Sequence, residues 1–157
     1  MARFRLLLVL CMIMSGFGSG SHARYRNPIV PGDWSDPGLV KVGSYYYSLR
    51  STFGFKPGLP IIRSKDLVRW EYAGYVFQDN QLIPDGKTGM GTYGSDIGFN
   101  PNTRQFVAYT PIDRRIYAYT AKDPAGHWEG PYDLDLKGYD PGFFADDDGR
   151  LYLALTK

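Results

Sequence analysis

The sequence is 157 residues long, which is the length of one small domain. It carries 18 basic and 16 acidic residues, and once Arg3 and Arg5 are set aside the remaining 16 basic residues balance the 16 acidic ones. A neutral chain gives no basis for predicting a nucleic-acid partner or binding to an anionic membrane, and it favours a neutral ligand. Cys11 is the only cysteine, so the sequence excludes a disulfide framework and a cysteine-based metal site.

Residues 1–23 are predicted to be a secretory signal peptide. Two arginines precede an apolar run at residues 6–14, and a stretch of small residues then leads to a cleavage site after Ala23. The apolar run is shorter than the roughly 20 residues that span a bilayer. We therefore expect residues 24–157 to be exported to the periplasm or the outside of the cell, with no membrane association after cleavage.

Short alternating runs follow the predicted signal peptide, and they are bounded by Gly, Pro, Asn and Asp, which favour turns. The sequence predicts ten strands, in chain order: Leu39–Val42, Tyr45–Arg50, Pro60–Ser64, Trp70–Phe77, Ile97–Asn100, Gln105–Thr110, Ile116–Ala121, Trp128–Leu134, Gly142–Ala145 and Leu151–Thr156. No amphipathic helix is predicted after residue 23. Regular short strands of this kind indicate a sandwich, a barrel or a propeller.

An internal repeat favours the propeller. The segment Ser64–Glu71 is similar to Ala121–Glu129, because each has Lys-Asp, a short turn and then Trp-Glu entering a strand. Trp70 and Trp128 are 58 residues apart, and four strands in a unit of that size are typical of a propeller blade. A third unit starts at Asp140 and holds two strands. We therefore expect an all-β fold, a truncated piece of about two and a half blades, since propellers have four to eight.

Two Asp-Pro-Gly sequences precede predicted strands, at Asp36 and at Asp140. Asp before Pro is a common turn element, so each aspartate has a purely structural explanation. The chain is also rich in aromatic residues, which make up 16% of it and include 13 tyrosines. These residues favour strands through packing, and their faces can also stack on sugar rings. Together, the two rigid carboxylates and the aromatic residues suggest an enzyme that acts on sugars.

Several short motifs occur in a fixed order: Asn27-Pro28, Pro31-Gly32, Asp36-Pro37, Gly43, Tyr45-Tyr46, Ser64–Trp70 and Tyr139–Leu153. In order and spacing they resemble the N-terminal portion of glycoside hydrolase family 43, and the resemblance covers Asn27 to Lys157. It implies a five-bladed propeller with the inverting activity of β-xylosidases, α-L-arabinofuranosidases and arabinanases. The expected substrates are oligo- or polysaccharides such as xylan, arabinoxylan and arabinan, and no cofactor is expected.

The resemblance also implies roles for both aspartates. The general base falls on Asp36 and a modulator of the acid's pKa falls on Asp140, whereas the general-acid Glu falls beyond Lys157. An inverting glycosidase needs a base that activates water and an acid that protonates the leaving oxygen. A nearby negative charge raises the pKa of that acid and keeps it protonated. Without the acid, the 157-residue piece itself is expected to be inactive.

Four aromatic residues are candidate sugar contacts, with plain packing as the alternative for each. Phe53 matches an aromatic wall of the innermost subsite, and Tyr139 precedes Asp140 where the family usually has an aromatic residue. The family usually has a Trp-Ala-Pro motif where this chain reads Tyr93-Gly94-Ser95, so Tyr93 takes the place of the Trp. Trp34 is a further candidate. Asp96 is expected to form a turn or to line the site, without being a third catalytic group.

Two other protein classes are alternatives to this interpretation. A non-catalytic glycan-binding propeller would lack the downstream Glu. A retaining enzyme acting on fructosyl sugars would carry Arg-Asp-Pro where this chain has Tyr139-Asp140-Pro141. A calcium loop is suggested by Asp146–Gly149, but its remaining ligands and terminal Glu are missing, which favours a hairpin turn. His127 has no paired ligand, so no metal site is expected.

Overall fold

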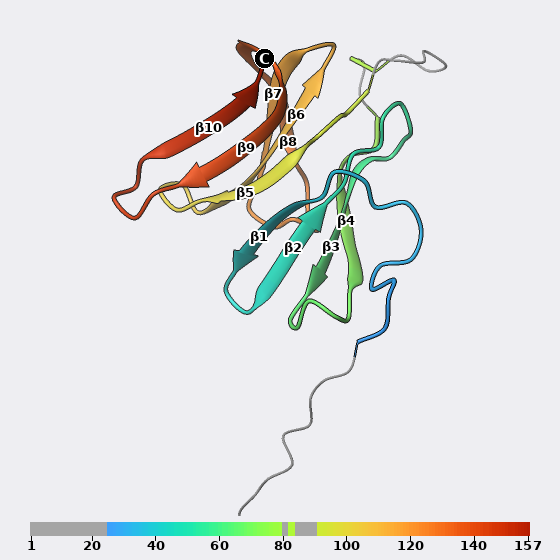
Figure 1. The fold of residues 1–157 in the computed structure, drawn as a ribbon. Helices are drawn as coiled ribbons and strands as arrows, with labels where there is room; N and C mark the ends of the chain where they lie inside the picture. Colours follow the sequence, from blue (N-terminus) through green and yellow to red (C-terminus); the bar gives the residue numbers. More distant parts are fainter. Residues whose placement is uncertain (1–24, 80–81, 84–90) are drawn as a thin grey trace, which may run out of the picture.

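The computed structural model describes residues 25–79, 82–83 and 91–157, so the predicted signal peptide lies outside the described residues. Ten strands form three antiparallel sheets (Figure 1). Blade 1 consists of β1 (Gly38–Val42), β2 (Tyr45–Leu49), β3 (Gly58–Ser64) and β4 (Glu71–Phe77). Blade 2 consists of β5 (Asp96–Asn100), β6 (Gln105–Ile112), β7 (Arg115–Ala121) and β8 (Glu129–Lys137). The half-blade consists of β9 (Tyr139–Ala145) and β10 (Leu151–Thr156).

The ten predicted strands are all present, and their ends differ from the prediction by up to three residues. The start of β9 is the difference that matters for function, because β9 begins at Tyr139 and not at Gly142. Tyr139 pairs with Thr156, and the register of β9 and β10 shifts between Gly142 and Tyr139. This β-bulge lets the strand extend toward its N-terminus. Asp140 therefore lies within a strand, and the prediction that it precedes one was wrong.

The first strands of the three units lie next to one another. β5 packs against β1 on one side and against β9 on the other (Figure 1). Within each unit the strand order follows the chain, so every first strand has the same place in its sheet. The segments that lead into β1, β5 and β9 are thereby brought to one end of the molecule.

The hydrophobic core lies between blade 1 and blade 2. Leu49, Leu59 and Ile61 of blade 1 are completely buried, and Ile97 and Ala108 of blade 2 pack into the same cluster. Burying a Leu or Ile side chain contributes about 1.5–3 kcal/mol relative to exposing it. The two blades thus stabilise each other, as expected for neighbouring repeats that share a continuous core.

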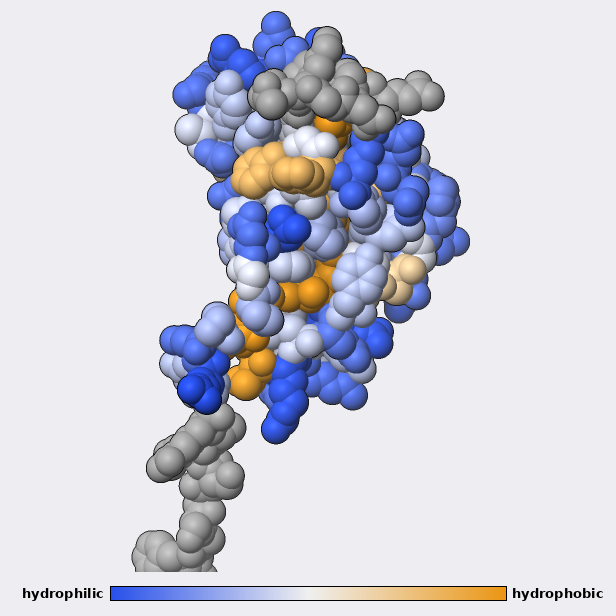
Figure 2. Space-filling view, turned by 90° about the vertical axis from the view of Figure 1, so that its right-hand side faces the viewer, coloured by the Kyte–Doolittle hydropathy of each residue, from blue (hydrophilic) through white to orange (hydrophobic). Residues whose placement is uncertain are grey.

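The molecule has a largely polar outer side, and its apolar exposure is local. Figure 2 shows that hydrophilic residues cover most of one side and that hydrophobic residues appear there only in small patches. The half-blade exposes aromatic residues, since Phe144 is 60% exposed and its ring lies 6.2 Å from that of Tyr152. Among the residues that the structure describes, no helix has the length and hydropathy needed to span a bilayer.

The sequence repeat corresponds to a structural turn in each of the two blades. In blade 1, the Asp66 carboxylate accepts the N–H groups of Val68 and Arg69 at 2.9 and 2.7 Å. In blade 2, Asp123 accepts the N–H of Ala125 at 2.9 Å. Each turn is closed by the following tryptophan, whose indole N–H donates to a backbone oxygen within it. The repeated Lys-Asp…Trp pattern is therefore a turn that joins two strands, and it has no part in the candidate site.

Replacing Asp66 by alanine is expected to lower the stability of the protein at neutral pH and to have little effect near pH 2. The backbone N–H groups of Arg69 and Val68 lower the pKa of Asp66 from 3.8 to about 2. A carboxyl group with a lowered pKa in the folded state stabilises the protein above its unfolded pKa, and this contribution is lost as the pH falls through the folded pKa. Chemical denaturation between pH 7 and pH 2 measures the difference.

Asp147→Ala is the matched control, because this exposed side chain makes no hydrogen bond or ion pair with any residue of the described part. A stability loss in Asp66→Ala that stays constant down to pH 2 would contradict the assignment.

Candidate active site

A shallow pocket of about 400 Å³ lies where the segments leading into β1, β5 and β9 meet. Three carboxylate residues line it: Asp36, Asp96 and Asp140. The other lining residues are small or apolar: Pro37, Gly38, Gly94, Ser95, Pro141 and Gly142. The structure thus brings Asp36, which precedes blade 1, together with Asp140 of the half-blade. No basic side chain is among the described residues that line the pocket.

Asp36 and Asp140 share an unusual backbone conformation. Their φ angles are 47° and 48°, and both residues are followed by Pro-Gly. Positive φ is uncommon outside glycine, and a residue before proline ordinarily prefers an extended conformation. Such a conformation costs on the order of 1–3 kcal/mol and is typically found at functional sites. Both side chains are exposed, so both carboxylates are open to solvent and to a ligand.

Gly94 makes room for the Asp140 carboxylate. A Cβ atom at this position would overlap with Asp140 Oδ1, and the φ of Gly94 is 54°. Both observations require glycine. The departure from Trp-Ala-Pro at Tyr93-Gly94-Ser95 is therefore linked to the position of Asp140 in this protein. The sequence alone could not reveal this link, because the two residues belong to different blades.

Asp96 lines the pocket and also binds the half-blade. Its Oδ2 accepts the N–H of Phe143 at 2.8 Å, and its Oδ1 accepts the N–H of Ile97 at 2.9 Å. Burial raises the pKa of Asp96, and the two N–H groups oppose this rise. The sequence prediction of a site-lining residue agrees with this position. The sequence did not predict the hydrogen bond from the Phe143 N–H, because Phe143 and Asp96 are 47 residues apart in the chain.

Phe53 and Tyr93 form an aromatic pair beside the pocket. Their ring centroids are 5.2 Å apart. Phe53 exchanges two backbone hydrogen bonds with Thr92, at 3.1 and 3.0 Å, and Tyr93 directly precedes the pocket residue Gly94. Both rings are partly exposed. Their proposed contact with sugar stays a prediction, but the backbone bridge holds them as a unit at the site.

Trp34 and Tyr139 have partners of their own. The Trp34 indole N–H donates to Ser48 Oγ at 3.3 Å, and the guanidinium of Arg50 lies 5.8 Å from the Trp34 ring. Tyr139 is 40% exposed, and Arg114 lies 5.5 Å from its ring. Trp34 is therefore held by a hydrogen bond and a cation–π contact, whereas Tyr139 is a partly exposed ring, covered by Arg114, next to Asp140 in the chain. Sugar contact by either residue stays a prediction.

A layer of buried hydroxyl groups lies between the two blades and supports the site. The Thr52 N–H donates to Thr92 Oγ1 at 2.9 Å, and Ser95 Oγ donates to Thr110 Oγ1 at 2.8 Å. The Ser95 N–H donates to Ser51 Oγ at 3.5 Å. Buried hydroxyl groups that are hydrogen-bonded in this way fix one arrangement of their neighbours, whereas the buried Ser35 Oγ has no hydrogen-bond partner among the described residues. The layer was missed at the sequence level, since isolated Ser and Thr residues give no sign of pairing.

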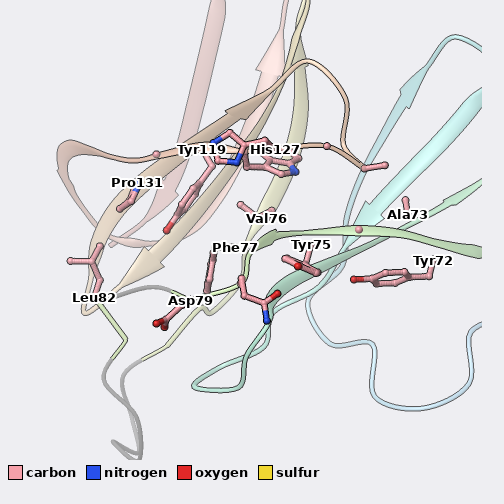
Figure 3. A pocket seen from close by; sticks show the side chains of 16 residues that line it. Tyr72, Ala73, Tyr75, Val76, Phe77, Asp79, Leu82, Tyr119, His127 and Pro131 are labelled. Carbon is pink, nitrogen blue, oxygen red and sulfur yellow. The ribbon is translucent and has the colours of Figure 1, made fainter.

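A larger groove of about 810 Å³ runs between β4 and the β7–β8 region. Figure 3 shows Tyr72 and Tyr75 along β4, with His127 on the facing side. Among the described residues that line the groove, one is acidic, and this residue, Asp79, forms an ion pair with Lys56. These described residues include none that line the carboxylate pocket and no pair of carboxylates, so the size of the groove does not make it the candidate catalytic site. No group of three or more potential ligands that could hold a metal occurs in the described ranges.

Comparison with known proteins gives consistent matches. The chain is 32% identical over 155 residues to the non-reducing end α-L-arabinofuranosidase BoGH43B of Bacteroides ovatus, a match that covers 94% of this chain and 29% of the relative. It is 33% identical over 136 residues to a xylosidase/arabinosidase of Butyrivibrio fibrisolvens, covering 84% of this chain and 26% of the relative. The chain therefore spans less than a third of these curated relatives.

Solved structures agree with this relationship. The GH43 protein BlXynB of Bacillus licheniformis superposes with a TM-score of 0.75 at 28% identity, over 84% of this chain and 29% of that protein. The Bacteroides ovatus GH43B structure superposes with a TM-score of 0.76 at 30% identity, over 85% of this chain and 27% of that protein. These likenesses confirm the all-β propeller fold. The profile of Glycosyl hydrolases family 43 matches residues 25–157, and the chain belongs to this family.

Proposed function

We propose that the chain is part of an exported enzyme that hydrolyses the O-glycosidic bonds of pentose-containing plant polysaccharides with inversion. The observation that carries this proposal is the shared pocket of Asp36 and Asp140, two exposed carboxylates held in a strained conformation near the N-terminal ends of β1 and β9, which both pack against β5. Relatives named β-xylosidase and α-L-arabinofuranosidase support xylan, arabinoxylan and arabinan as substrates. Export rests on the signal-peptide pattern of residues 1–23.

The two aspartates have different proposed roles. Asp36 acts as the general base that removes a proton from the attacking water. Asp140 acts through its negative charge, which raises the pKa of a general-acid Glu and so keeps that acid protonated. The Glu is proposed to come from the part of the enzyme outside these 157 residues. In an inverting enzyme the base and the acid are about 6.5–9.5 Å apart, which leaves room for the water.

The full-length enzyme is expected to release pentose from aryl β-xylosides or aryl α-L-arabinofuranosides, with inverted configuration in the first product. Proton NMR during the first minutes of the reaction identifies the anomer before mutarotation. A first product of retained configuration would overturn the inverting mechanism. Binding of xylan or arabinan without any hydrolysis would favour the non-catalytic glycan-binding propeller.

A polypeptide of residues 24–157 serves as the comparison in the same assay. It contains both aspartates, but it lacks the general acid assigned above, so it is expected to release no pentose. Measurable release by this purified polypeptide would show that the acid lies within these residues.

A further inference from the structure

Asp96 contacts the first strand of every unit. Within β5 it accepts the N–H of Ile97, and toward β9 it accepts the N–H of Phe143 at 2.8 Å. Toward β1 it lies so close to Gly38 that a Cβ atom there would stand 2.7 Å from Asp96 Oδ1. Gly38 is two residues from Asp36, and Phe143 is three residues from Asp140. One carboxylate therefore contacts both β1, which begins two residues after Asp36, and β9, which contains Asp140.

The junction between blade 2 and the half-blade is built around this hydrogen bond. Asp96 pairs with Tyr109 across β5 and β6, and the Tyr109 ring stacks on Phe143 with centroids 5.6 Å apart. The Phe143 ring also occupies the space over Gly98, where a Cβ atom would overlap with it. The hydrogen bond and the ring contacts thus fix the same residue of β9. Because Phe143 is close to Asp140 along a bulged strand, fixing Phe143 also fixes Asp140.

We infer that Asp96 is a positioning residue for the hydrolytic reaction: it sets the separation of Asp36 and Asp140 and adds a negative charge beside them. This inference rests on the proposed function. Asp96 is not placed in contact with the substrate, and it acts through the two strands that it holds. Displacements of about 1 Å in an active site can lower the rate by about 100-fold, so a single positioning contact can have a large kinetic effect.

The charge of Asp96 has its own consequence. The titratable groups around it are Asp36 before β1, Asp140 in β9 and Tyr109 in β6. No Arg, Lys or His is among the described residues that line this pocket. Like charges disfavour one another's ionised forms, so the negative charge of Asp96 bears on the ionisation of the pocket as a whole. Removing this charge is therefore expected to move the acidic limb of the pH–rate profile of the enzyme to lower pH.

The test is Asp96→Asn in the full-length enzyme, with Asp133→Asn as the matched control. Asp133 lies in β8, where it is paired with Arg115. We expect kcat per folded molecule to fall by about 10- to 100-fold in Asp96→Asn. The acidic limb of the pH–rate profile is expected to move to lower pH by about half a unit or more. KM is expected to change by less than about threefold. The control is expected to keep the wild-type kcat and pH profile.

A purely structural role predicts a different result, namely a lower melting temperature with kcat and the pH profile of the folded fraction unchanged. That result would overturn the inference. Asp96→Glu retains the charge, so it is expected to lower kcat and to leave the acidic limb in place.

If Asp96→Asn does not fold, Gly38→Ala decides, because the added Cβ would overlap with Asp96 Oδ1 and with the backbone at Asp96 and Ile97, and so would displace Asp96 relative to β1 without removing any charge. An unchanged kcat in folded Gly38→Ala would overturn the inference, and a fall of about 10-fold or more would support it. Wild-type enzyme without any hydrolytic activity would refute the proposed function, and the inference with it. An active wild type, an inactive Asp36→Asn and an unaffected Asp96→Asn would refute the inference alone.

Discussion

Asp36→Asn is expected to abolish detectable hydrolysis by the full-length enzyme, since general-base catalysis contributes about 10²- to 10⁴-fold to the rate. An amide cannot accept the proton of the attacking water. The substitution should leave the fold intact, because the side chain is exposed and asparagine tolerates the positive φ of 47° found at this position. The measurements are kcat on aryl pentosides and the melting temperature.

Substrates with activated leaving groups sharpen this test. They need little help from the acid but the same help from the base, so they are not expected to rescue Asp36→Asn. Asp33→Asn is the control, because Asp33 is exposed three residues earlier and has no hydrogen bond or ion pair with any part of the chain that the structure describes. Near-normal turnover by Asp36→Asn would show that another group is the base.

Asp140→Asn is expected to lower kcat at neutral pH and to move the basic limb of the pH–rate profile to lower pH by about one unit. The negative charge of Asp140 raises the pKa of the general acid, so its removal lets the acid lose its proton at a lower pH. Asparagine has nearly the same size as aspartate, fits against Gly94 and tolerates the φ of 48°. The pH dependence of kcat/KM between pH 4 and pH 9 gives the measurement.

The two aspartates are distinguished by the same series of leaving groups. Activated aryl pentosides are expected to restore much of the rate of Asp140→Asn, because its defect lies in protonation of the leaving oxygen. Asp147→Asn, in the β9–β10 hairpin turn, is the control for a lost carboxylate near β9. A basic limb that stays in place in Asp140→Asn would contradict the modulator role, even if kcat fell.

Much of the fold was predictable from local patterns. Alternating apolar residues and turn-forming Gly, Pro, Asn and Asp gave ten strands, and the repeat of Lys-Asp…Trp gave the two blades. These signals are local, since each strand pairs with its neighbour in the chain. The start of β9 was not predictable, because the bulge that places Asp140 inside the strand depends on how Tyr139 pairs with Thr156.

The candidate site was only partly predictable. Asp36 and Asp140 were singled out by Asp-Pro-Gly and by the resemblance to the family. The contacts that surround them were not, because they join residues of different blades. The bond from Phe143 to Asp96 spans 47 residues, and the bond from Thr52 to Thr92 spans 40. No periodicity or motif in the chain reports such contacts, since they arise only when the blades pack.

The chain order of the strands within each blade also has a consequence for biogenesis. Every strand finds its hydrogen-bonding partner among residues already synthesised or about to be synthesised, with no partner from a remote part of the chain. Pairing of sequence neighbours requires little loop-closure entropy and favours rapid formation. The strand pairs of blade 1 can therefore form early and offer their core face to blade 2. Maturation of this protein can proceed one blade at a time, from the N-terminus onward.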